Sequence, residues 1–323
     1  MKDPISIIEA AYRVDNSDSG WLAELAQTTA RAMGHNQGVM AFQYDASSGD
    51  WIHIRNVAFE RLPPEFVQRI FDQPEASLEQ RKAFTRLYTS LSFGSLREKF
   101  VPVAPGIGVL LEHFGFEDLV GINALDPTAR GCMIGVVAGK RRFPRRTVEV
   151  WRRLAAHVAA GNRLRRTLQA LTQENVDPTT TAEAVLTPAG RVEHALDPAK
   201  PRAARTALCD ALVGIHRARA RNADPARAID LWRALVSGRW SIVEHFERDG
   251  KRYYLAHKND PELAEDRALT PRERQVLGYA ELGHSDKLIA YELGLAPSTV
   301  STLLSTARRK LGRSLELLRS SPK

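Results

Sequence analysis

The side chains with the most distinctive chemistry lie together near the C-terminal end of the chain. Hydroxyl groups recur over a short segment and precede a run of cations; the set comprises Ser298, Thr299, Ser301, Thr302, Ser305, Arg308, Arg309 and Lys310. Hydroxyls donate and accept hydrogen bonds, while Arg and Lys neutralise phosphate groups. The segment therefore suits a polar, anionic partner, and Lys287 supplies a further cation nearby. The alternative for the basic run is a solvated helix end, where the helix dipole favours cations.

The sequence contains no pattern typical of catalysis. It has no glycine-rich phosphate loop, no Gly-x-Ser-x-Gly turn and no nucleophile beside an evident base. Its nine histidines have no metal-ligand spacing, and we expect them at the surface or satisfied in the core. We therefore predict that the protein is not an enzyme and has no catalytic residue, metal or cofactor. The alternative is an enzyme, or a haem or flavin sensor, in the N-terminal half.

Composition bounds the class of protein. A chain of 323 residues predicts two or three domains, and a net charge of +8 favours an anionic partner. The two cysteines, Cys132 and Cys209, are far apart in the chain and fit a reducing compartment. No apolar run approaches the roughly 20 residues that span a bilayer, and no signal-peptide core follows Met1. We expect a cytoplasmic protein without a membrane segment.

Helix-start and helix-stop residues surround the hydroxyl and basic segment. Thr270 and Glu273 have the spacing of a capping box, and Pro271 takes the first helical position, where its missing N–H costs nothing. Gly283 ends this predicted helix, and Ser285 caps the next one. The first of three short helices therefore begins at residue 271.

A tight turn is predicted between the second and third helices. Ala290 is small where two helices of such a motif cross, and Gly294 suits a left-handed turn residue. Val300 and either Leu303 or Leu304 then anchor the third helix. The alternative is a helical hairpin buried within a larger domain.

The segment from about 266 to 320 resembles the LuxR-type helix-turn-helix domain. It has the opening Leu-Thr-Pro-Arg-Glu, the helix Lys-x-Ile-Ala-x-x-Leu-Gly and the third helix Thr-Val…Lys-Leu-Gly. The resemblance implies a transcriptional regulator whose third helix enters the major groove of double-stranded operator or promoter DNA. Thr299 resembles the family's backbone-contacting threonine. If Val300 and Leu304 point inward, the candidates for base-edge contact on the outward face are Ser301, Thr302 and Ser305. The basic cluster suits phosphate neutralisation, and Lys287 can reach the flanking backbone.

The chain departs from the family pattern on its third helix. The family commonly has lysine where this chain has Ser301 and histidine where it has Leu303, and Ala296 replaces a usual serine or threonine cap. A serine accepts from or donates to many base edges, whereas lysine prefers guanine acceptors. We therefore expect a target unlike the common family site. Residues 314–319 are interpreted as a shortened version of the family's last helix.

The predicted elements of residues 1–172 are helices 4–14 and 20–33, strands 37–44 and 51–58, a helical stretch 63–88, strands 119–125 and 131–138, and a helix 144–171. This order resembles a GAF domain, which implies small-molecule or signal sensing. The long helix carries an apolar stripe of Trp151, Leu154, Val158, Gly161, Leu164, Leu168 and Leu171. Two interpretations of the stripe remain open, an intradomain core or a seam with the same helix of a second copy.

Residues 173–181 are polar and predict a linker. The predicted elements of residues 182–260 are strands 183–186 and 191–195, helices 199–221 and 225–237, and strands 239–247 and 252–257. This order resembles a reduced PAS-like module, which implies sensing or coupling.

The predicted fold class is multidomain α+β. A GAF-like α/β sensor spans 1–172, a reduced PAS-like α+β module spans 182–260, and an all-α helix-turn-helix domain spans 266–323. The predicted function is sequence-specific DNA binding controlled by the N-terminal domains, in a homodimer that answers a small-molecule or protein signal. The alternative is a protein-interaction regulator with a degenerate helix-turn-helix that sequesters other factors.

Overall fold

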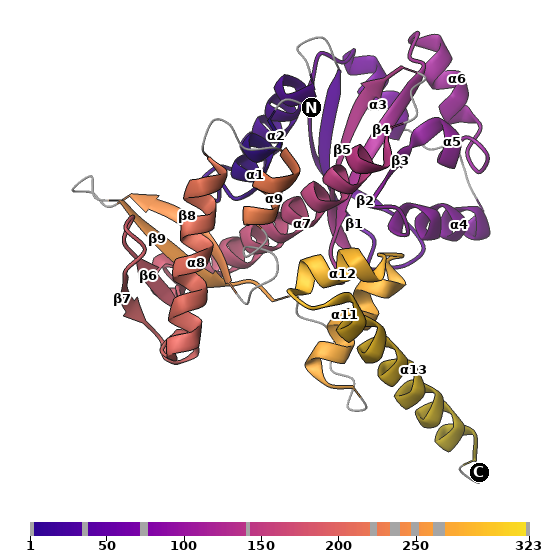
Figure 1. Cartoon of the computed structure of the whole chain (residues 1–323). Coiled ribbons are helices and arrows are strands. Elements are labelled where there is room, and N and C mark those ends of the chain that lie inside the picture. The colour runs from indigo at the N-terminus through magenta and orange to yellow at the C-terminus, as the bar shows by residue number, and fades with distance from the viewer. Residues whose placement is uncertain are drawn as a thin grey trace.

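Two antiparallel sheets lie on either side of one long helix, and three further helices follow at the C-terminal end (Figure 1). The computed structural model describes residues 3–33, 38–71, 77–139, 143–219, 225–232, 240–246, 252–260 and 269–320. None of the helices in this part of the chain has the length and apolar character that a bilayer crossing requires.

The first sheet has the strand order β2-β1-β5-β4-β3, with every pair antiparallel. Its strands are β1 (Val39–Asp45), β2 (His53–Glu60), β3 (Phe93–Ser95), β4 (Asp118–Leu125) and β5 (Arg130–Ala138). Side chains alternate between the faces, so Val39 and Ala41 enter one apolar cluster while Met40 and Phe42 enter another. Four of these strands were predicted within two residues of their ends, whereas β3 was not predicted.

Helices cover both faces of this sheet. One face packs against α1 (Pro4–Ala11), α2 (Asp18–Met33) and α7 (Arg145–Gln173), and the other against α3 (Pro64–Phe71), α4 (Leu78–Thr89), α5 (Leu96–Phe100) and α6 (Gly106–His113). The predicted helical stretch 63–88 is two helices, because Ser77 starts α4 with its own capping box. Residues 72–76 of that prediction lie outside the described residues.

The long helix α7 is enclosed by the chain itself. Residues 154–165 are buried all round, and a Cβ on Gly161 would lie 2.3 Å from the carbonyl oxygen of Ala11, so α1 crosses α7 closely there. Two buried polar side chains on α7 bond to other elements: Asn162 accepts from Gln43 at 2.9 Å, and Arg163 donates to Asn259 at 3.1 Å. The structure thus supports the intradomain interpretation of the apolar stripe and leaves no free dimer seam along it.

The second sheet has the antiparallel order β7-β6-β9-β8. Its strands are β6 (Ala184–Leu186), β7 (Val192–Ala195), β8 (Trp240–Phe246) and β9 (Arg252–Lys258), with α8 (Arg202–Ala218) and α9 (Pro225–Trp232) packed beside them. Single 3-10 turns occupy Pro178–Thr181 and Asp197–Ala199. The predicted helix ends at 221 and 237 lie outside the described residues.

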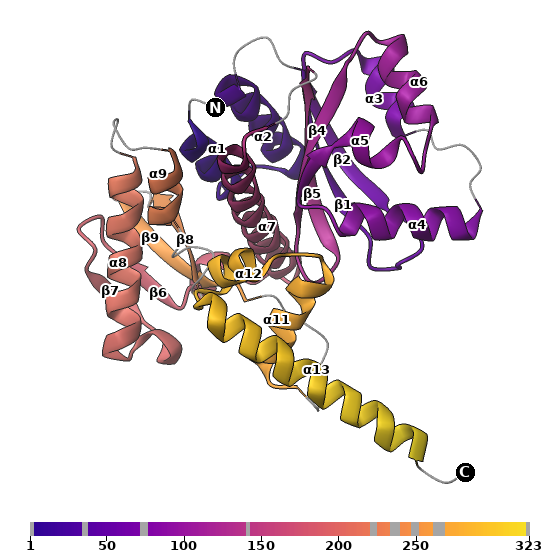
Figure 2. The ribbon, with the colours of Figure 1, turned by 45° about the vertical axis from the view of Figure 1, so that its right-hand side comes forward.

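The two sheets share one buried core. A single apolar cluster contains Leu25 of α2, Ile134 of β5, Trp151 of α7, Leu212 of α8 and Tyr254 of β9. Figure 2 shows why: α7 runs between the sheets and presents side chains to both. Residues 1–172 and 182–260 are therefore successive segments of the chain that pack as one body.

The C-terminal helices are α11 (Pro271–Glu281), α12 (Asp286–Leu293) and α13 (Pro297–Ser320). The predicted capping box is present, with Thr270 and Glu273 bonded reciprocally, and Gly294 has the left-handed φ of 65°. The interpretation of 314–319 as a separate last helix is wrong, because α13 continues without a break to Ser320. No helix breaker interrupts it: Gly312 costs only about 1 kcal/mol within a helix.

Candidate nucleic-acid interface

The start of α13 is positioned by its neighbours within the three-helix group. Ile289, Ala290 and Leu293 of α12 pack with Val300 and Leu304 of α13 in a small apolar core. The turn before α13 includes Gly294, whose positive φ is strained for other residues. This packing buries one stripe of α13 and leaves the opposite stripe in solvent.

The exposed stripe of α13 is a surface of hydroxyl groups, which we call the recognition surface. Its members are Ser298, Thr299, Ser301, Thr302 and Ser305, and all are exposed. The hydroxyl of Thr302 donates to the backbone oxygen of Ser298 at 3.0 Å, as threonine does within a helix. The structure thus brings together the five hydroxyl residues predicted from the sequence.

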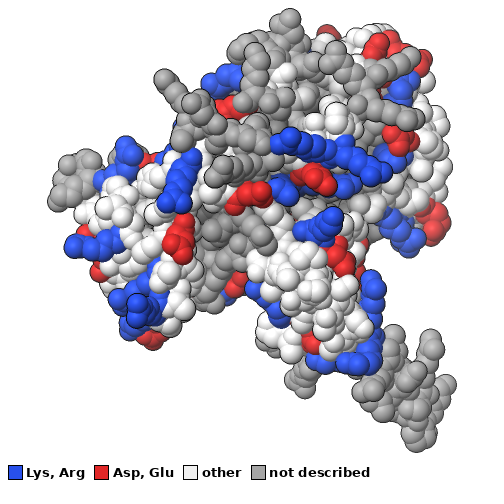
Figure 3. Space-filling view, viewed as in Figure 1, with Lys and Arg blue, Asp and Glu red and all other residues white. Residues whose placement is uncertain are grey.

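The predicted cations fall into two groups. Lys287, Arg308 and Arg309 are exposed and make no ion pair with the described residues. Lys310 instead binds both carboxylate oxygens of Glu273, at 2.9 and 2.7 Å. That pairing, together with the backbone N–H of Thr270, lowers the pKa of Glu273. Figure 3 shows Lys and Arg side chains gathered at the edge of the lobe formed by α11, α12 and α13.

An acidic residue lies beside the recognition surface. The hydroxyl of Ser301 donates to Oδ2 of Asp286, the first residue of α12, at 3.0 Å. Asp286 carries no signal of this role in the sequence, because only the helix-turn-helix geometry brings it next to a residue 15 positions away. This carboxylate adds a hydrogen-bond acceptor to a surface that otherwise carries hydroxyls.

The three-helix group also contacts the body of the protein at two places. At the first, the hydroxyl of Tyr291 on α12 donates to the carbonyl oxygen of Ile229 at 3.2 Å and lies 2.9 Å from Nε2 of His157. The guanidinium of Arg153 lies over the Tyr291 ring, 5.2 Å from its centroid. Tyr291 has no role that the sequence predicts, because its partners come from α7 and α9.

The second contact is made by the turn between α11 and α12. Leu282 packs against the apolar cluster on the α3–α6 face of the first sheet. Gly283, with a φ of 74°, lies so close to Ser90 that a Cβ would be 2.9 Å from the carbonyl oxygen of Ser90. The apolar pattern from Val276 predicts that Leu282 faces the core of its own domain, whereas the structure packs it against the apolar cluster of the first sheet.

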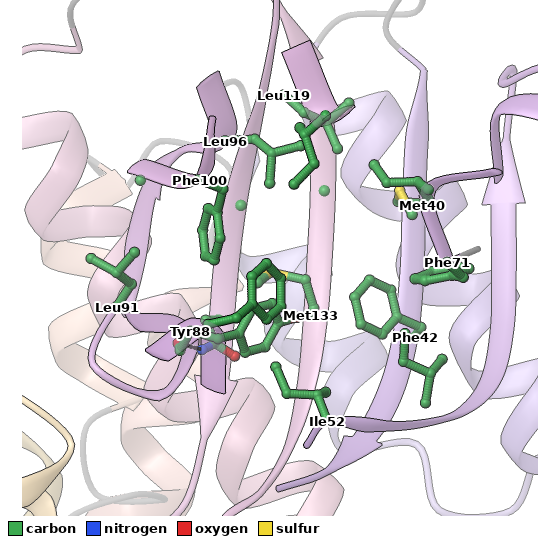
Figure 4. A pocket seen from close by; sticks show the side chains of 18 of the residues that line it. Met40, Phe42, Ile52, Phe71, Tyr88, Leu91, Leu96, Phe100, Leu119 and Met133 are labelled. Carbon is green, nitrogen blue, oxygen red and sulfur yellow. Dashed lines mark hydrogen bonds between the residues drawn. The ribbon is translucent and has the colours of Figure 1, made fainter. Parts of the chain in front are cut away.

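That apolar cluster surrounds a cavity of about 320 Å³. In Figure 4, Phe100, Tyr88 and Leu91 lie on one side of the space and Phe42 and Phe71 on the other. Gly94, Gly121 and Gly135 stand in register across β3, β4 and β5, so this row of the sheet carries no side chains. The missing side chains leave room above the sheet.

Few polar groups of the wall are open to a ligand. Asn123 lines the cavity, but it accepts from the hydroxyl of Tyr44 and donates to the carbonyl oxygen of Tyr88 at 2.8 Å. The hydroxyl of Tyr88 is itself buried out of reach of solvent. A molecule in this cavity would therefore meet mainly hydrocarbon and aromatic surface.

No metal site is formed by the part of the chain that the structure describes, where no three His, Cys, Asp or Glu side chains gather suitably. Cys132 is fully buried, and burial raises the pKa of its thiol. Burial also lowers the pKa of His157 to about 3, so its ring is neutral at pH 7.

The helices α12 and α13 form a helix-turn-helix whose second member, α13, exposes one face to solvent. This is the architecture of a DNA-binding domain. Residues 267–314 match the family described as bacterial regulatory proteins of the luxR family. The C-terminal part of the chain is thus a LuxR-family helix-turn-helix domain.

Curated relatives agree with this assignment. The chain is 38% identical over 85 residues to the HTH-type transcriptional regulator MalT of Vibrio campbellii, and equally to that of Vibrio parahaemolyticus. It is 32% identical over 97 residues to the regulator of the same name from Vibrio cholerae. These matches cover 26–30% of this chain but only 9–11% of the relatives. The printed names of these relatives describe transcriptional regulators of the helix-turn-helix type.

Proposed function

We propose that this protein is a sequence-specific DNA-binding regulator of transcription in the cytoplasm. Base edges in the major groove are read by Ser301, Thr302 and Ser305 of its recognition surface. The phosphate backbone is contacted by Thr299, Lys287, Arg308 and Arg309. The observation that carries the proposal is the exposed hydroxyl stripe of α13 on a LuxR-family scaffold. A homodimer on a two-fold operator is part of the proposal, although α7 offers no seam for it.

We further propose that residues 1–260 form a sensor of an uncharged, mainly apolar small molecule. The strand order β2-β1-β5-β4-β3 with helices on both faces supports a GAF-like arrangement, and the second sheet supports a reduced PAS-like one. The cavity of about 320 Å³ lies at the lower end of the volumes typical of ligand pockets. An ionised ligand is disfavoured, because a buried charge needs a charged partner, and the described lining of the cavity carries no Asp, Glu, Lys or Arg side chain.

The cavity and the DNA-binding domain are neighbours. Leu91 lines the cavity at the end of α4, and the preceding residue, Ser90, touches Gly283 of the α11–α12 turn. A ligand that displaces Leu91 would therefore change the surface on which the DNA-binding domain rests. This proximity supports control of DNA binding by the sensor.

Selection from a random double-stranded DNA library tests the DNA-binding part. The full chain should enrich a defined sequence, and Thr299→Ala and Ser305→Ala should each weaken binding to it by about fivefold, the value of one hydrogen bond. Thr206→Ala is the matched control, because this exposed hydroxyl on α8 bonds only to the backbone of Arg202. Absence of any enriched sequence would instead favour the regulator that sequesters other proteins.

A thermal-shift screen with uncharged small molecules tests the sensor. Gly94→Leu should abolish any shift by filling the cavity, since a Cβ at this position meets nothing closer than 3.6 Å. Gly106→Leu is the control, because a Cβ there meets open space. A ligand that still binds the Gly94→Leu protein would place the sensing site elsewhere.

A further inference from the structure

The helix α12 is almost entirely covered. All residues from Leu288 to Leu293 are buried, and only Asp286 and Lys287 at the start reach solvent. Part of this burial lies within the three-helix core, but Tyr291 belongs to the large apolar cluster of the body. The helix is therefore shared between the DNA-binding domain and the rest of the chain.

A chain of hydrogen bonds runs through this contact. The hydroxyl of Tyr291 donates to Ile229, so Nε2 of His157 must carry the proton that it shares with Tyr291. A neutral ring has one N–H, which leaves Nδ1 as an acceptor facing the hydroxyl of Tyr12 at 3.5 Å. One tyrosine hydroxyl thus links α12 to α7 and α9, and through His157 to α1.

This docked position conflicts with DNA binding in two ways. In helix-turn-helix complexes the first helix of the pair crosses the DNA backbone, and here that helix is α12, which lies against α7. Two domains on a two-fold operator must also sit about 34–36 Å apart, or a multiple of that distance. A domain held by α7 and α9 cannot turn or shift to meet that spacing.

We propose that the contact of Tyr291 with His157 and Ile229 is autoinhibitory: it holds the DNA-binding domain against the body, and DNA binds the released domain. The inference rests on the proposed function, since it takes α13 to be the DNA-binding element.

Removing one hydroxyl tests this contact with little change in packing. Tyr291→Phe keeps the ring in the apolar cluster and under Arg153, but removes the hydrogen bonds that Tyr291 makes with the carbonyl oxygen of Ile229 and with Nε2 of His157. A buried polar group without its partner shifts such an equilibrium by about 5- to 100-fold. While the docked form predominates, the affinity for DNA rises by the same factor.

Two measurements are made on the full chain without added ligand. Hydrogen exchange of the α12 backbone reports release, and titration of the selected DNA at fixed salt reports affinity. Tyr291→Phe should speed the exchange and tighten binding about 5- to 100-fold. Tyr254→Phe is the matched control and should change neither, because its buried hydroxyl has no hydrogen-bond partner in the described part of the chain.

Arg153→Gln is a second variant that leaves the buried relay intact. It removes the cation over Tyr291 and the 2.7 Å ion pair with Asp230, and it should act in the same direction with a smaller effect. Faster exchange with unchanged or weaker DNA binding would overturn the inhibitory role. Unchanged hydrogen exchange of α12 in both variants would show that this contact does not hold the DNA-binding domain against the body. A wild-type protein that selects no DNA would contradict the proposed function instead.

Discussion

Charge removal on α13 should change the salt dependence of DNA binding differently at neighbouring positions. Arg308 and Arg309 are exposed without an ion pair among the described residues, whereas Lys310 is held by both oxygens of Glu273. A cation that neutralises a phosphate releases a counterion, so each such contact steepens the fall of log K with log salt by about 0.9. The charge of Lys310 is already neutralised by Glu273, so Lys310 should release little counterion from the DNA.

The expected magnitude follows from the exposed cations. If Lys287, Arg308 and Arg309 each neutralise one phosphate, these three contacts contribute a slope of about −2.7 for one domain and twice that for two. Arg308→Gln or Arg309→Gln should reduce the slope by about 0.9 per domain. Lys310→Gln should leave the slope nearly unchanged and instead destabilise the domain, because Glu273 is buried and loses its partner.

The assay is a titration of the selected DNA duplex at four or more salt concentrations, with urea unfolding of each variant as the control for folding. Equal reductions of slope in all three variants would refute the reasoning, because they would show that DNA draws Lys310 away from Glu273. A slope that does not respond to Arg308→Gln or Arg309→Gln would remove these arginines from the interface.

Three further predictions concern stability and specificity. Thr270→Ala should lower the free energy of unfolding by about 0.5–2 kcal/mol, because the first turn of α11 loses its cap; urea unfolding measures it, and no loss would contradict the capping box. Burial lowers the pKa of His157 from 6.5 to about 3, so the folded state disfavours the charged ring. The free energy of unfolding is therefore at its full value above pH 6.5 and falls as the pH drops toward 3. Acidification from pH 7 to 5 should therefore lower the free energy of unfolding by about 2 kcal/mol, measured by urea unfolding. The same loss in His157→Gln would show that it does not come from His157. Asp286→Asn should relax the preference for a base with an exposed amino group, because a carboxylate beside Ser301 accepts only; an unchanged selected sequence would exclude Asp286 from specificity.

Local patterns were reliable where one residue type satisfies one backbone requirement. Thr270, Glu273 and Ser285 cap the helices as predicted, and Gly294 takes the left-handed conformation that few other residues adopt. Strand-forming runs joined by turn residues predicted four strands of the first sheet, at residues 37–44, 51–58, 119–125 and 131–138. The short strand β3 escaped detection, since Phe93–Ser95 is too brief to show a period.

Partners of charged and amphipathic groups were not predictable in the same way. Lys310 belongs to a basic cluster in sequence, yet the crossing of α13 over α11 brings it to Glu273, 37 residues away. The stripe on α7 has the spacing of either a core or a seam, and only the packing of two sheets and α1 around it decides between them. Periodicity gives the direction of a side chain but not the surface that it meets.

The sequence by itself determined the class of the C-terminal domain, because caps, turn glycine and buried spacing are local and repeat the family pattern over residues 267–314. Tertiary structure alone decided how that domain relates to the rest. It sets Leu282 and Gly283 against the wall of an apolar cavity, and Tyr291 against His157 and Ile229. The physical reason is that these contacts join residues more than 60 positions apart, whose meeting depends on how whole helices and sheets pack.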